Sequence, residues 1–156
     1  MKVSNIITGA AAAVLVFAAG QTLANPSNVN EPIRHVILDL DGTVISHSWT
    51  TVTISFVATA TTSDIGFAFR DDPAFIYFDN ASVTTGSSPN LLSNGGFETG
   101  DLNGWTYHNP NNATFAGNVA NGGNPGFAWL DGSVQTYDTL DKFIATSIGY
   151  TYHVIF

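Results

Sequence analysis

The chain has 156 residues, of which 12 are Asp or Glu and 4 are Lys or Arg, so its formal net charge at pH 7 is −8. This charge argues against a nucleic-acid-binding protein, because the phosphate backbone would repel it. Apolar residues make up 44% of the chain and charged residues only 10%, which excludes the composition of a disordered segment, and the lack of cysteine excludes disulfides and zinc–thiolate sites.

Residues 1–24 have the pattern of a secretory signal peptide. Lys2 supplies a short positive segment, an apolar run from Ile6 to Ala19 follows it, and Thr22-Leu23-Ala24 places a small residue where signal peptidase cuts. The apolar run is shorter than the ~20 residues that a membrane anchor needs. We therefore expect this leader to be cleaved, residues 25–156 to be secreted to the exterior or the periplasm, and no membrane span to remain.

The first apolar run after the leader, His35–Leu40, ends in an acidic motif. Val36–Thr43 resembles the first motif of haloacid-dehalogenase-like phosphatases, which implies Asp39 as nucleophile and Asp41 as acid and base. Such enzymes also need a βαβ sheet and a later lysine, whereas Lys142 is the only lysine after the leader and no crossover helix is visible. A strand followed by an Asp-Gly turn is the simpler interpretation, so we do not expect an enzyme.

Alternating apolar and hydroxyl residues predict strands along the rest of the chain. The clearest case is Thr51–Thr61, where every even position is apolar and only Val57 interrupts the polar odd positions. Further strands are expected at 65–70, 75–83, 105–108, 127–130, 142–146 and 150–156. Turns are expected at Asp41-Gly42, 62–64, 94–96, 121–126 and Asp131-Gly132. Many short strands with Gly and Asn turns predict an all-β fold, an antiparallel β-sandwich of the jelly-roll kind.

A polar linker, residues 85–90, divides the secreted part into halves 25–84 and 91–156. Each half alone would be a marginal all-β domain, with no disulfide to stabilise it. We therefore expect residues 25–156 to form one β-sandwich domain.

Two segments carry a family resemblance. Asn90–Trp105, with its Asn-Gly-Gly-Phe-Glu core, resembles the opening of galactose-binding-like jelly rolls, the fold of many bacterial carbohydrate-binding modules. Phe67–Val83 resembles the closing two strands of the same family, and the whole resemblance covers most of residues 33–156. The closing segment precedes the opening one here, which implies a circular permutation.

A permuted sandwich can be completed in two ways. The linker can join the two halves within one chain, in which case we expect Tyr150–Phe156 to lie beside His35–Leu40. Alternatively, each half completes its mate in another subunit by strand exchange, which would build a homo-oligomer or a fibre and make the protein structural or adhesive.

The resemblance also implies a structural calcium site. An acidic residue near the Gly-Gly-Phe-Glu segment and an Asp of the final strand hold the ion in the family, and the matching residues are Glu98 and Asp79. Carboxylate and carbonyl oxygens suit calcium. The alternative is that either carboxylate only caps a turn and faces water.

Aromatic residues near polar ones suggest a carbohydrate site, because a flat ring packs on the apolar face of a sugar. Tyr107, Trp129 and Tyr137 are the candidates. The polar neighbours in sequence are Asn109, Asn111, Asn112, Asp131 and Gln135. The expected partner is therefore a glycan or another extracellular surface.

Overall fold

The structure, a computed structural model, describes residues 3–5, 13–19, 36–40, 48–71, 74–112, 117–123 and 126–156. These residues form strands and turns with no helix, and thus no helix of a length and apolarity that would cross a membrane is found among them. The strands are β1 (Val3–Asn5), β2 (Ala13–Ala19), β3 (Val36–Asp39), β4 (Thr53–Val57), β5 (Thr62–Arg70), β6 (Ile76–Phe78), β7 (Ser82–Thr84), β8 (Thr106–His108), β9 (Asn118–Gly123), β10 (Gly126–Asp131), β11 (Asp138–Ala145) and β12 (Thr151–Ile155).

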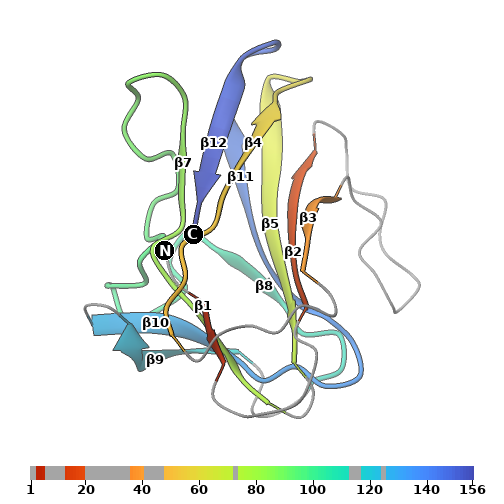
Figure 1. Cartoon of the computed structure of the whole chain (residues 1–156), viewed down its shortest axis with the longest axis vertical. Helices are drawn as coiled ribbons and strands as arrows, with labels where there is room; N and C mark the ends of the chain where they lie inside the picture. Colours follow the sequence, from red (N-terminus) through yellow and green to blue (C-terminus); the bar gives the residue numbers. More distant parts are fainter. Residues whose placement is uncertain are drawn as a thin grey trace.

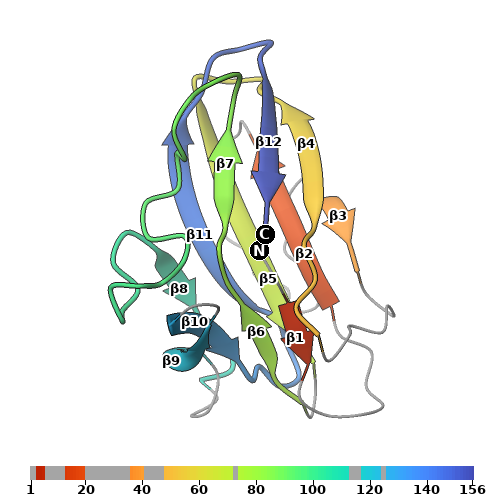
Figure 2. The same cartoon turned by 60° about the vertical axis from the view of Figure 1, so that its left-hand side comes forward.

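All strand pairs are antiparallel and form three sheets, which confirms the predicted all-β class. A five-stranded sheet has the order β3-β2-β5-β11-β8, a three-stranded sheet β4-β12-β7, and a four-stranded sheet β1-β6-β10-β9. The three-stranded sheet lies over the five-stranded sheet as a second layer (Figures 1 and 2). The arrangement is sandwich-like.

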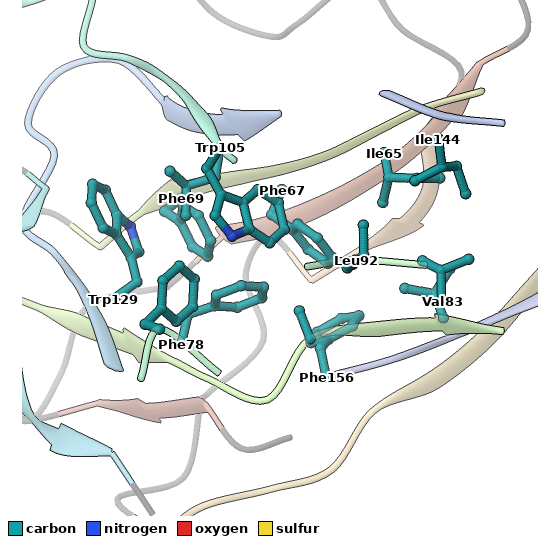
Figure 3. Packing of buried hydrophobic residues seen from close by; sticks show 14 of the residues in the cluster. Ile65, Phe67, Phe69, Phe78, Val83, Leu92, Trp105, Trp129, Ile144 and Phe156 are labelled. Carbon is teal, nitrogen blue, oxygen red and sulfur yellow. The ribbon is translucent and has the colours of Figure 1, made fainter. Parts of the chain in front are cut away.

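Aromatic side chains fill the space between the layers (Figure 3). Phe67 of β5 contacts Phe78 of β6 at a ring-centroid distance of 4.6 Å and Phe156, which follows β12, at 5.4 Å. These three rings are fully buried. Because large aromatic side chains contribute most of the buried apolar area, this cluster stabilises the contact between the sheets.

The two halves of the sequence interleave within one chain. β11 of the second half lies between β5 and β8, and β12 lies between β4 and β7. The turn that joins the halves is closed by Asn90, whose Oδ1 accepts hydrogen bonds from the backbone N–H groups of Val83 and Leu92, each at 2.9 Å. Both sheets are therefore completed by strands from both halves.

The predicted alternation at residues 51–61 is confirmed in β4. Odd positions are exposed, and Ile54 and Phe56 are partly buried, with Phe56 stacked on Tyr152 of β12 at 5.4 Å. The predicted place of the last strand was wrong: β12 pairs with β4, with Val154 opposite Ile54, and not with His35–Leu40. The reason is that β3 pairs with β2 in the other layer.

Three predicted turns or strands differ in detail. The predicted turn at Thr62–Asp64 is instead the beginning of β5, because these residues pair with Phe143–Ala145 of β11 and Ser63 and Asp64 are buried there. The predicted turn at 121–126 is shorter than expected, because Asn121–Gly123 are the end of β9 and Gly126, opposite Gly123, begins β10. The predicted strand 75–83 is split into β6 and β7, and Asn80 between them has a φ of 57°.

Part of the predicted leader is strand in this uncleaved chain. β1 pairs with β6, and β2 pairs with β5 along its whole length. Cleavage after Ala24 stays a prediction. Asp41 and His35 lie outside the described residues.

Candidate functional site

Asp79 and Glu98, the two predicted calcium ligands, lie near the same three glycines. Asp79 directly follows β6, and Glu98 lies in the loop that contains Gly95 and Gly96. A Cβ atom on Gly96 would lie 3.8 Å from Asp79 Oδ1 and 3.8 Å from Glu98 Cγ. Gly96 therefore lies close to both side chains, with Asn80 Oδ1 nearer still at 3.4 Å from the same position.

The β9–β10 hairpin lies against the same two side chains. A Cβ atom on Gly123 would lie 3.0 Å from Asp79 Oδ2, and one on Gly126 would overlap the Glu98 carboxylate. The backbone N–H of Phe127 donates to Glu98 Oε1 at 3.1 Å. We call Asp79, Glu98 and Gly96, Gly123 and Gly126 the glycine corner; it joins segments of both halves of the chain.

The donor set of the glycine corner suits a hard cation. Asp79 is 1% exposed and accepts hydrogen bonds from Asn80, from the backbone N–H at 2.6 Å and from Nδ2 at 3.1 Å, whereas Glu98 is exposed. In the parts of the chain that the structure describes, no group of three or more His, Cys, Asp or Glu is placed to hold a metal ion. A calcium ion here would thus combine two carboxylates with carbonyl or water oxygens.

The predicted sugar-binding aromatic residues lie mostly inside the protein. Trp129 of β10 is fully buried and Tyr137 is 8% exposed, while Tyr107 of β8 is partly buried. The Tyr107 and Trp129 rings meet edge to face at 4.9 Å, and Gly117 lies against both. A sugar needs a free ring face, so the burial of Trp129 and Tyr137 speaks against their predicted role, and Tyr107 is the candidate that keeps an exposed part.

A buried acidic cluster lies under these rings, and the sequence did not reveal it. Tyr107 Oη donates to Asp138 Oδ2 at 2.5 Å, and Asp131 Oδ2 accepts from the backbone N–H and Oγ of Ser133 at 3.0 and 2.7 Å. Asp131 and Asp138 are each 1% exposed. One signal in the sequence is that Asp131 directly follows the apolar residues of the predicted strand 127–130, but the Gly that comes after it favours a turn there.

Burial dominates the electrostatics of this acidic cluster. It raises the pKa of Asp131 to about 7, with a further rise from the Asp138 charge and an opposing effect of the two Ser133 hydrogen bonds. Burial also raises the pKa of Asp138 to about 6 against the hydrogen bond from Tyr107, and raises the pKa of Tyr107. Among the described residues no donor reaches Asp131 Oδ1. The buried surroundings thus favour the protonated, uncharged form of the Asp131 and Asp138 carboxyl groups.

Other candidate groups have structural partners. Lys142, which a phosphatase would need near Asp39, donates instead to the carbonyl oxygen of Ser93 at 2.9 Å and lies 5.5 Å from the Trp105 ring centroid. Asp39 is exposed on β3. His108 is 3.6 Å from Asp141 on the outer side of the sheet.

Two aromatic side chains that were not predicted to bind a ligand are strongly exposed. Phe143 of β11 is 56% exposed, and Tyr150, just before β12, is 62% exposed. Both lie in segments interpreted as strands with an ordinary alternating pattern, so nothing in the sequence marked them.

Comparison of the chain with family models, curated proteins and solved structures found no match.

Proposed function

We propose that this protein is a secreted, non-catalytic module that binds carbohydrate or another extracellular surface, with a galactose-binding-like jelly-roll fold in permuted order and a structural calcium ion. The observation that supports this best is the glycine corner, where Asp79 and Glu98, from different halves of the chain, lie near the same three glycines.

The junction between the two resembling segments supports the permuted order. The backbone N–H of Ala81 donates to the Gly95 carbonyl at 2.8 Å, and that of Leu91 donates to the Val83 carbonyl at 2.8 Å. The segment that resembles the family's end therefore runs directly alongside the segment that resembles its beginning.

Calcium in this proposal connects the halves and raises stability. The Asp79 and Glu98 carboxylates would hold the ion, whose charge offsets their mutual repulsion. We expect the melting temperature of the full chain to rise by at least about 5 °C from excess chelator to saturating calcium, because a ligand that binds only the folded state stabilises it.

Two variants make the calcium test specific. Glu98→Gln should abolish the calcium-dependent rise. Asp101→Asn, which changes a nearby exposed carboxylate that Thr99 Oγ1 and the Asn103 backbone N–H already bind, should retain it. A melting temperature that is the same with calcium and with chelator would refute the calcium site.

Tyr107 is the residue on which we place the glycan contact, since it is only partly buried and Asn109 and Asn111 follow it closely in the sequence. The negative charge of the chain favours neutral glycans. On a glycan array we expect binding to a neutral class. Tyr107→Ala should lower the affinity at least about tenfold, and Tyr107→Phe should keep it.

Tyr150→Ala provides the matched control for this site. Tyr150 is an exposed ring outside the proposed contact, so its removal should leave glycan affinity unchanged. If Tyr150→Ala loses glycan binding and Tyr107→Ala keeps it, the contact lies at Tyr150 and not at Tyr107. If the unmodified protein binds no glycan, the carbohydrate proposal is refuted.

A further inference from the structure

The inference concerns strand β5 and rests on the proposed secretion. In the uncleaved chain, β2 covers one edge of β5 over seven residue pairs, from Ala13 opposite Arg70 to Ala19 opposite Asp64. β2 lies entirely within the predicted leader. Removal of residues 1–24 therefore removes the hydrogen-bonding partner from this edge.

β5 is a poor strand to leave unpaired. All its residues from Ser63 to Phe69 are buried, and Ile65, Phe67 and Phe69 point into the core. An open edge would expose unpaired N–H and C=O groups beside apolar side chains, and such an edge tends to recruit another strand.

The sequence of β5 is complementary to itself in the antiparallel direction. We propose that, after the leader is removed, β5 pairs with β5 of a second copy of this chain about a twofold axis at Phe67. In this register Asp64 lies opposite Arg70 of the partner subunit, and Arg70 opposite Asp64 of the partner subunit. Opposite charges on directly facing residues stabilise an antiparallel pair, and a twofold axis produces the pair twice.

The remaining pairs of the same register fit as well. Gly66 faces Ala68 of the partner subunit on the face of β5 opposite to Ile65, Phe67 and Phe69, where both residues are small. Ile65 faces Phe69 of the partner subunit on the core side. The length of this pairing equals that of the β2 pairing it replaces.

β3 of the same chain is a less suitable replacement. β3 is antiparallel to β2, and β2 is antiparallel to β5, so β3 runs parallel to β5. Moving β3 next to β5 in its present direction would give a parallel pair without the two charge pairs, whereas the second copy gives an antiparallel one.

The first test compares two forms of the full chain. One is produced with its leader in an exporting bacterium and collected after export, and the other is retained in the cytosol. Intact mass reports the cleavage, and light scattering after size exclusion reports the assembly. We expect the exported form to lack residues 1–24 and to be a dimer, and the uncleaved form to be a monomer.

An exported form that keeps the leader refutes secretion by cleavage and this pairing together. A cleaved form that is a monomer, or larger than a dimer, refutes the pairing alone.

Introduced cysteines test the register, since the chain has none of its own. The exported double variant Asp64→Cys/Arg70→Cys should form a disulfide-linked dimer. Each single variant should not, because equal residues at these positions lie about 20 Å apart across the axis. Equal cross-linking of single and double variants, or none in either, contradicts the register.

Charge reversal tests the same register independently, without introduced cysteines. Arg70→Glu should weaken the dimer at least about tenfold, since the introduced carboxylate would face Asp64 of the partner subunit and repel it. The double variant Asp64→Arg/Arg70→Glu should restore dimerisation. Failure of the double variant to recover the dimer, with unchanged far-ultraviolet circular dichroism, would overturn the proposed pairing.

Discussion

At the scale of single residues, the glycine corner contains two positions, Gly123 and Gly126, where a Cβ atom would overlap neighbouring atoms. Gly126 has a φ of 86°, and a Cβ atom there would overlap the Glu98 carboxylate. Gly86 in the linker also has a positive φ, 54°, but no atom lies within 4 Å of its Cβ position. Substituting Gly126 and Gly86 in turn therefore distinguishes the cost of backbone strain from the cost of steric overlap.

Gly126→Ala should lower the free energy of unfolding by about 2–3 kcal/mol, and Gly86→Ala by about 1 kcal/mol, because only the first adds overlap to the strain of a left-handed conformation. Urea unfolding of the two variants measures the difference. Equal losses would mean that Glu98 moves aside without cost and that the corner is loosely packed.

The site residues show where sequence reasoning reaches its limit. A motif resemblance selected Asp79 and Glu98, and the structure places both near Gly96. Their role as calcium ligands stays a prediction. The burial of Trp129 was not predictable, since an aromatic residue within an alternating strand has equal local patterns on the inner and outer faces. Which face is covered depends on strands that are distant in sequence.

At the scale of secondary structure, β4 shows how far local pattern can determine an element. Its alternation fixed its inner face correctly, whereas the Thr62–Asp64 part of β5 was misassigned because polar residues there are paired and buried by β11. Ser63 Oγ lies 3.1 Å from Thr146 Oγ1, a contact between residues 83 positions apart. Turn-forming residues are ordered into a strand by such distant partners.

The inner face of β4 can be tested by truncating one residue on each side. Phe56→Ala should lower the free energy of unfolding by about 2–3 kcal/mol, less than for a fully buried ring because Phe56 is only partly buried, and should remove the stack on Tyr152. Thr53→Ala, on the exposed face, should change it by less than about 0.5 kcal/mol. Similar losses in the two variants, measured by urea unfolding, would show that the faces are assigned incorrectly.

At the scale of the whole molecule, buried carboxyl groups make stability depend on pH. Burial raises the pKa of Asp131 to about 7 and the pKa values of Asp71 and Asp138 to about 6, all above the unfolded value of 3.8. The folded state therefore binds more protons than the unfolded state between these limits. Their contribution to stability is fully present below about pH 4 and is lost as the pH rises through 6 to 7.

We expect the free energy of unfolding, measured in chelator, to fall by about 2–4 kcal/mol between pH 4.5 and pH 8, mainly through Asp131. Asp131→Asn should flatten this dependence, because the amide carries no charge to bury. Asp101→Asn is the control: hydrogen bonds from Thr99 and Asn103 lower the pKa of that exposed carboxyl, so its effect has the opposite sign. A stability that rises from pH 4.5 to pH 8 would contradict the assignment.

The interleaving of the two halves also governs how the protein is made. β4 and β5 are synthesised well before β11 and β12, which pair with them from the end of the chain. The β2–β3 and β2–β5 pairs can form early, but the β5–β11 and β4–β12 pairs have to wait until nearly the last residue has been added, and contacts this distant in sequence form slowly. Under the proposed secretion, a chain exported before this point would cross the membrane before its two layers are complete.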